Sequence, residues 1–147
     1  TVGVAIEAQQ ATEDTNFIYA LPVGAFTDAD ITDRLSFTAT LANGDALPTW
    51  LQLDALTGIF SGTPGNQDVG DLHVRVIATD PVGASASQTF ELTVANTNDA
   101  PEVAITLTGQ QAFEDALFTF ALPENLFRDA DVSDCQTGLA LTQKNAL

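Results

Sequence analysis

The sequence predicts an all-β fold: one complete, seven-stranded Greek-key β-sandwich followed by an incomplete second repeat of the same module. Three observations support this prediction. Short segments with alternating apolar and polar residues are separated by glycine, proline and asparagine. A segment of 25 residues recurs 101 residues later. No window carries an apolar stripe of helical period over three turns, yet 45% of the residues are apolar, which is enough for a buried core.

Apolar and polar residues alternate in several segments between the two copies of the repeated segment. Strands are therefore expected at residues 35–41 (LSFTATL), 57–62 (TGIFSG), 73–79 (HVRVIAT) and 88–94 (QTFELTV). Residues 63–66 (TPGN) are predicted to form a loop. Trp50 is flanked by Leu47, Leu51 and Leu53 and is interpreted as a core residue. The alternative, a platform on which a sugar ring stacks, stays open at this point.

Residues 9–33 and residues 110–134 are two copies of one segment. At a constant offset of 101 residues, 14 of the 25 positions are identical without a gap. This period is the size of an immunoglobulin-like sandwich and is too long for a solenoid repeat. We expect a complete repeat at 1–97, a linker at 98–109 and a truncated second repeat at 110–147, cut from a longer tandem array. Since the similarity ends with the second copy, this second repeat lacks most of its strands and is expected to be partly disordered.

Composition restricts the kinds of partner. Four Lys and Arg residues stand against twenty Asp and Glu residues, a formal charge of −16. This charge repels phosphate backbones and anionic lipids, so no nucleic acid partner is expected. No apolar run is long enough for a membrane span, so no membrane insertion is expected. The single cysteine, Cys135, excludes a disulfide framework within the chain.

Acidic residues cluster where loops are expected. The clusters are Glu13-Asp14, Asp28-Ala29-Asp30, Asp80 and residues 96–101 (NTNDAP). On an extended segment, the carboxylates of Asp-x-Asp point to the same side and can share one ion. Calcium takes six to eight oxygen ligands of this kind, although acidic loops are also ordinary turn formers. The triplet recurs at matched positions with the NTNDAP segment between the copies, and this recurrence favours calcium.

Five strings carry a family resemblance. They are TEDTNF, FTDADITD, LPTWLQLDALTGIFSGTP, DVGDLHVRVIATDPVGASASQTFELTV and NTNDAP. With them the chain resembles the cadherin superfamily, specifically the dystroglycan-type cadherin-like repeats of large bacterial surface adhesins of the RTX type. The resemblance covers about residues 10–101 and resumes at 110–134. It implies an immunoglobulin/cadherin-like sandwich in a secreted or cell-surface protein.

The resemblance also implies where calcium (Ca²⁺) would bind. At the lower end of the first repeat, ligands from the sandwich and the linker would meet the Asp-x-Asp of the next repeat: Glu13, Asp68, Asn98 and Asp99 with Asp129 and Asp131. At the upper end, a preceding repeat would complete a site formed by Asp28, Asp30 and Asp80. The linker departs from animal cadherins at Asn96, where they carry Asp, and at Ala100, where they carry Asn. Fewer ions or weaker affinity are therefore expected.

The expected function is a calcium-binding structural or adhesive module that stiffens and extends a surface protein, with neighbouring repeats of the same chain as partners. One alternative is a carbohydrate- or protein-binding module of an adhesin or a polysaccharide-degrading protein, with an extracellular glycan or another surface protein as partner. A second alternative is a spacer that binds no ion. An enzyme is not expected, because the only histidine, His73, lies in a predicted strand and the acidic pairs recur with the module.

Overall fold

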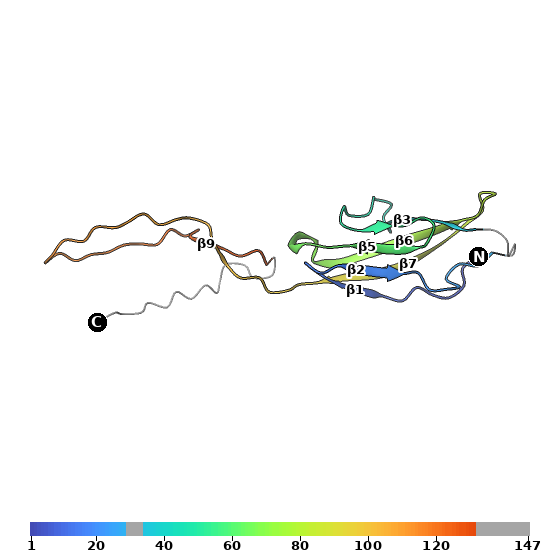
Figure 1. Ribbon diagram of the computed structural model, residues 1–147, viewed down its shortest axis with the longest axis horizontal. Coiled ribbons are helices and arrows are strands. Elements are labelled where there is room, and N and C mark those ends of the chain that lie inside the picture. Colours follow the sequence, from blue (N-terminus) through green and yellow to red (C-terminus); the bar gives the residue numbers. More distant parts are fainter. Residues whose placement is uncertain (29–33, 132–147) are drawn as a thin grey trace. The chain divides into compact units, whose positions relative to one another are not determined.

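The computed structural model describes residues 1–28 and 34–131 of the chain (Figure 1). The chain divides into two compact units, Thr1–Thr97 and Asn98–Leu147. Asp30, Cys135 and the end of the second repeat lie outside the described residues.

The described residues of the first unit form seven strands in two sheets (Figure 1). The strands are β1 (Gln9–Thr12), β2 (Phe17–Ala20), β3 (Ser36–Leu41), β4 (Gln52–Leu53), β5 (Ile59–Gly62), β6 (Gly70–Thr79) and β7 (Ser85–Ala95). One sheet has the order β1-β7-β6-β3 and the other the order β2-β5-β4. A short 3₁₀ turn, η1 (Asn66–Asp68), precedes β6. The predicted all-β, seven-stranded sandwich is confirmed.

Strands β6 and β7 form the longest hairpin and define the two ends of the sandwich. They pair antiparallel from Gly70↔Val94 to Thr79↔Ser85, whereas β1 runs parallel to β7. Along β6, Val74 and Val76 are buried and His73 is exposed. Successive side chains thus point alternately to the core and to solvent, as the sequence pattern predicted.

The predicted strand at 57–62 was too long at its start. The structure places Thr57 in the turn between β4 and β5, and β5 begins at Ile59. Gly58 ends this turn with a φ of +67° and donates its N–H to the carbonyl of Asp54 at 3.0 Å. A positive φ is adopted readily by glycine and interrupts an extended strand.

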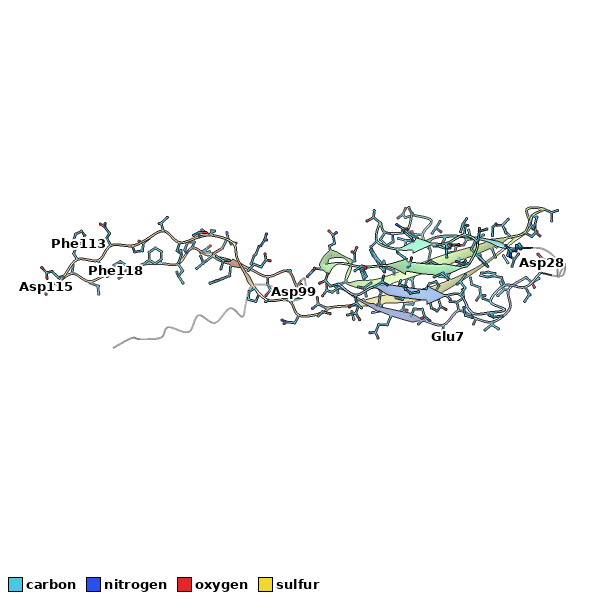
Figure 2. The ribbon with its side chains drawn as sticks, in the orientation of Figure 1. Glu7, Asp28, Asp99, Phe113, Asp115 and Phe118 are labelled. Atoms are coloured by element: carbon cyan, nitrogen blue, oxygen red, sulfur yellow. The ribbon has the colours of Figure 1, made fainter. Side chains whose placement is uncertain are left out.

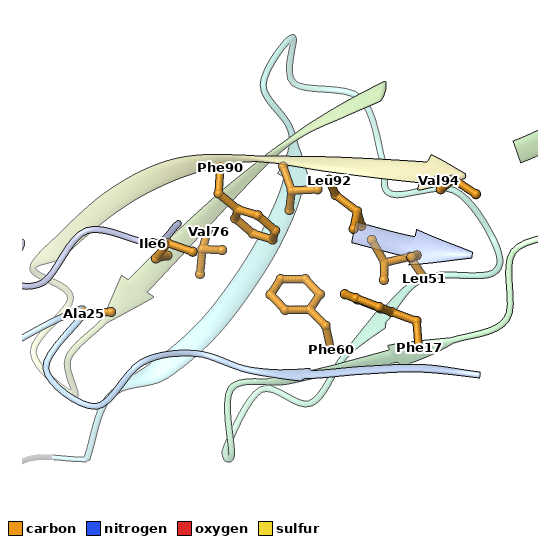
Figure 3. Close-up of a cluster of buried hydrophobic side chains, with 11 residues drawn as sticks. Ile6, Phe17, Ala25, Leu51, Phe60, Val76, Phe90, Leu92 and Val94 are labelled. Carbon is orange, nitrogen blue, oxygen red and sulfur yellow. The ribbon is translucent and has the colours of Figure 1, made fainter. Parts of the chain in front are cut away.

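A cluster of buried side chains from both sheets fills the sandwich (Figure 3). Phe60 of β5 is fully buried and meets Phe90 of β7 edge to face, with ring centroids 5.7 Å apart. Trp50 packs against this cluster and lies 6.4 Å from Phe17 in an edge contact. Its indole Nε1 is buried and has no hydrogen-bond partner among the described residues. The interpretation of Trp50 as a core residue is therefore confirmed.

The second unit repeats the local geometry of the first at the 101-residue offset. Residues 102–128, here called the arm, form a hairpin in which β8 (Glu102–Val103) pairs with β9 (Phe127–Arg128). The Val103↔Phe127 pair corresponds to the Val2↔Phe26 bridge of the first unit. Among the apolar residues described in this unit, Leu126 is buried and the others are not. The arm thus has the hairpin of a repeat without its covered core.

The turn between β4 and β5 is held by the Asp54 carboxylate. Its Oδ1 accepts hydrogen bonds from the backbone N–H groups of Thr57 and Leu56, both at 2.9 Å. These bonds favour the charged form and hold the pKa of Asp54 below its ordinary value of 3.8. A lowered pKa in the folded state stabilises the fold above the unfolded pKa, and this contribution is lost as the pH falls through the folded pKa.

We therefore expect the Asp54 carboxyl group to titrate below 3.8 in a carbon-detected NMR titration. Asp54→Asn keeps an acceptor oxygen but removes the charge, so it should flatten the fall in unfolding free energy below about pH 4. Urea unfolding over a series of pH values measures this difference. Asp45→Asn, in the neighbouring β3–β4 loop, is the control for a general effect of charge. An Asp54 pKa at or above 3.8 would contradict the role given to the two N–H donors.

Candidate functional site

Glu13 is the most buried charged residue at the end of the sandwich where β1 and β7 finish. Because β1 runs parallel to β7, with Thr12 beside Ala95, Glu13 and Thr97 leave their strands side by side. The Glu13 side chain is 1% exposed, and its Oε1 accepts the backbone N–H of Thr97 at 2.5 Å. Its Oε2 is buried and has no hydrogen-bond partner within the described part of the chain. Such an oxygen calls for a cation or an ordered water.

Asp68 lies at the same end, because η1 leads into β6 opposite the last residues of β7. Its Oδ2 accepts the backbone N–H of Gly65 at 2.9 Å. The backbone N–H of Asp14 donates to the carbonyl of Pro64 at 2.9 Å, which ties the Glu13 turn to the loop before η1. The first unit therefore brings both of its predicted lower-end residues, Glu13 and Asp68, to one end.

In the second unit, the linker meets the repeated Asp-x-Asp. Asp99 donates its backbone N–H to Oδ2 of Asp131 at 2.9 Å, and Asp131 is 7% exposed. Oδ1 of Asp129 accepts the N–H of Asp131 at 3.1 Å, and the Asn98 amide donates to the carbonyl of Asp99 at 2.8 Å. Residues that are 32 positions apart are thus in contact, as the resemblance implied. That they share an ion with Glu13 and Asp68 stays a prediction.

Asp28 and Asp80 lie together at the opposite end of the first unit. Both line a pocket of about 270 Å³, and Figure 2 shows Asp28 at this end of the sandwich. Oδ1 of Asp80 accepts the backbone N–H groups of Val82 and Ala84, each at 2.9 Å. One oxygen of Asp80 therefore holds the β6–β7 turn. The third predicted ligand, Asp30, lies outside the described residues.

No three His, Cys, Asp or Glu side chains among residues 1–28 and 34–131 lie close enough to hold a metal ion by themselves. The Glu13 carboxylate nevertheless suits a cation. Its Oε2 is buried, and no ion pair among the described residues neutralises its charge. The ion pair found among the described residues joins Arg128 and Glu102 of the second unit at 2.7 Å, and both side chains are largely exposed.

Two contributors to these ends were not predicted from the sequence. Thr97 lies in the NTNDAP segment but was not among the predicted ligands, yet its backbone N–H donates to Glu13. Gln88 of β7 holds the N-terminal segment by hydrogen bonds to three backbone groups, which are the carbonyls of Val4 and Ala25 and the N–H of Ile6. Contacts to backbone atoms leave no side-chain pattern, so no signal in the sequence could have indicated them.

Comparison with known proteins gives the family. The chain belongs to the family described as "Putative Ig domain" (He_PIG), whose model matches residues 1–95. No match was found among curated proteins. Within the described residues, no helix has the length and apolar character needed to cross a bilayer.

Solved structures support the immunoglobulin/cadherin-like fold. The chain is similar to the extracellular cadherin domains of protocadherin gamma B2, with 15% identity over 89% of this chain and 26% of that one, and a TM-score of 0.55. With the extracellular cadherin domains of protocadherin gamma B7, it shares 23% identity over 78% of this chain and 29% of that one, with a TM-score of 0.51. With an endo-fucoidan hydrolase of glycoside hydrolase family 107, it shares 25% identity over 63% of this chain and 13% of that one, with a TM-score of 0.50. The chain thus spans less than a third of each of these longer proteins.

Proposed function

We propose that this chain is a calcium-binding structural or adhesive module of the dystroglycan-type cadherin-like kind, which stiffens and extends a secreted or cell-surface bacterial protein. The observation that carries the proposal is the Glu13 carboxylate, buried to 1% exposure with one oxygen unpartnered among the described residues. The family match and the fold shared with protocadherin extracellular domains support the coarser class, an Ig-like structural or adhesive domain without a catalytic role.

In this proposal, calcium joins successive repeats. Glu13 and Asp68 would supply oxygens from the sandwich, and the group formed by Asn98, Asp99, Asp129 and Asp131 would supply the others. A preceding repeat would complete the site of Asp28, Asp30 and Asp80 in the same way. With a charge of −16, the ion-free chain repels itself at these ends, and the divalent ion removes this repulsion. The array is then flexible without calcium and extended with it.

Thermal unfolding in EDTA and in millimolar calcium tests the proposal. We expect calcium to raise the melting temperature of the first unit, because the unfolded chain has no preformed site. A concentration of 100 times the Kd stabilises by about 2.7 kcal/mol. For a unit of this size, that energy corresponds to about 10–20 °C. Glu13→Gln, which keeps the shape and removes the charge, should abolish most of the rise.

Two controls separate calcium from general screening. Magnesium at the same concentration should raise the melting temperature much less, since it demands a tighter octahedral site. Glu91→Gln changes an exposed carboxylate on the outer face of β7 and should leave the calcium response unchanged. An equal response of Glu13→Gln and the parent chain would refute Glu13 as a ligand. No response of either chain would favour the ion-free spacer.

The alternative of direct carbohydrate or protein binding has one observation in its favour, the likeness to a domain in the endo-fucoidan hydrolase chain. Against it, Trp50 packs on the core with its Nε1 buried, so only part of the ring is accessible for stacking on a sugar. Retardation of the chain in native gels that contain soluble polysaccharide, fucoidan included, would favour this alternative over the calcium module.

A further inference from the structure

The arm has an apolar face that the described part of its own unit leaves exposed. Its members alternate along the two sides of the hairpin and are 40–49% exposed: Ile105, Leu107, Phe118, Phe120 and Leu122. At the 101-residue offset, Leu107 and Phe118 correspond to Ile6 and Phe17, which are 7% and 9% exposed in the first unit. The internal repeat therefore shows what kind of surface covers such a face, namely the remaining strands of this same sandwich.

The arm also has the backbone shape of the segment that it copies. Asp14 and Asp115 both adopt a φ of +56°, a left-handed conformation that is uncommon for residues other than glycine. The Gly3 N–H donates to the Ala25 carbonyl at 2.9 Å, and the corresponding Ala104 N–H donates to the Leu126 carbonyl at 2.9 Å. Figure 2 shows Phe113, Asp115 and Phe118 at the turn end of the arm. The arm is thus preformed in the conformation that the first unit binds.

The first unit holds its own N-terminal segment largely through backbone atoms. Gln88 donates to the carbonyls of Val4 and Ala25, at 3.0 and 2.6 Å, and accepts the N–H of Ile6 at 3.2 Å. Strand β1 pairs with β7, and the N–H of Glu13 donates to the Ala95 carbonyl at 3.0 Å. Any segment with the same conformation and similar apolar side chains can make these contacts. The arm satisfies both conditions.

We infer that the arm of one molecule docks on the first unit of a second copy of this chain, in place of residues 2–27. The arm would lie beside β7 and β5 and bury Leu107 and Phe118 where Ile6 and Phe17 lie now. One hairpin replaces another of the same kind, so the exchanged form is close in free energy to the monomer and gains population with concentration. The contact joins two different surfaces, the arm of one chain and the first unit of the next. Such a head-to-tail contact links chains into open assemblies or closed rings. The replaced segment includes Glu13, so in the exchanged form its counterpart Glu114 would take the place of Glu13 at the end of the sandwich.

Cysteine trapping detects such an exchange even when it is a minor form. Gln10 lies beside Thr93 in the β1–β7 pair, and Gln111 is the arm's counterpart of Gln10. With Cys135→Ser as background, the pair Thr93→Cys and Gln111→Cys is mixed as isotopically heavy and light chains, incubated and oxidised. We expect peptide mapping to show a disulfide between positions 93 and 111 that joins a heavy chain to a light chain. The pair Thr93→Cys and Gln10→Cys should cross-link within one chain and validates the geometry.

Two matched arm variants distinguish docking from chance collision. Phe118→Asp puts a charge where Phe17 is buried, so the heavy–light cross-link should be lost while the first unit melts as before. Leu117→Asp changes a residue that is 93% exposed and whose counterpart, Asn16, is also exposed, so the cross-link should persist. The inference is overturned if the 10–93 disulfide forms without any 93–111 disulfide between chains, or if Phe118→Asp leaves the cross-link unchanged.

Discussion

Phe60→Ala is expected to destabilise the first unit by about 3–5 kcal/mol, a large part of its total stability. Phe60 is fully buried in the middle of the sandwich, where it contacts Phe90 edge to face and forms part of the cluster that joins the two sheets (Figure 3). Removing a buried phenylalanine ring destabilises a protein by about 3–5 kcal/mol, through lost burial and the cavity left behind. Single domains are stable by only about 5–15 kcal/mol. Thermal and urea unfolding followed by circular dichroism measure the loss.

The matched control is Ile18→Ala on the adjacent strand β2. Ile18 is 67% exposed on the outer face of the same sheet, so its truncation should change the unfolding free energy by no more than about 0.5 kcal/mol. Phe60→Leu should lie between the two, since it keeps most of the apolar volume. A loss for Phe60→Ala as small as that for Ile18→Ala would show that the two sheets do not share this core.

The strands that could be predicted from the sequence are those with one buried face. In β6, Val74 and Val76 point inward and alternate with exposed residues, so the period of two is visible. Strand β1, with the sequence QQAT, has no such pattern, because Ala11 is its only buried apolar residue and its pairing with β7 uses the backbone. Strand β4 contains only two residues. Backbone pairing at a sheet edge leaves too little side-chain pattern to detect.

The acidic ends could be predicted only in part, for a related reason. The resemblance indicated that Asp99 and Asp131 approach each other, and they are in contact in the second unit. The burial of Glu13 depends on the return of the chain at Thr97, 84 residues later, which no local pattern encodes. Asp-rich loops are ordinary turn formers, and one oxygen each of Asp80 and Asp129 does serve a turn. Only the complete fold separates these local roles from ligand roles.

Gly62→Ala is expected to disrupt the contact between the two most specific motifs of the chain, PTWL and TGIFSGTP. A Cβ at position 62 would lie 1.7 Å from the Trp50 carbonyl oxygen and 2.8 Å from its carbonyl carbon. These are backbone atoms, so the clash cannot be relieved by a change of side-chain rotamer. The Trp50 segment is itself held by Leu51, which is 3% exposed and donates its N–H to the Pro48 carbonyl at 3.0 Å. Trp50 must therefore move away from Phe17, and we expect a loss of about 3 kcal/mol in chemical unfolding.

Gly44→Ala separates this close contact from simple backbone strain. Gly44 has a φ of +96°, but a Cβ there would meet nothing within 4 Å. Its substitution should destabilise the first unit by only about 1–2 kcal/mol, the energy of the left-handed conformation. The fluorescence of the single tryptophan gives a second measurement, because Gly62→Ala should expose the indole and shift its emission to the red, whereas Gly44→Ala should not. Equal losses of unfolding free energy in the two variants, with unchanged emission, would mean that the Trp50 carbonyl does not exclude a Cβ at position 62. The co-occurrence of the two motifs would then need another physical cause.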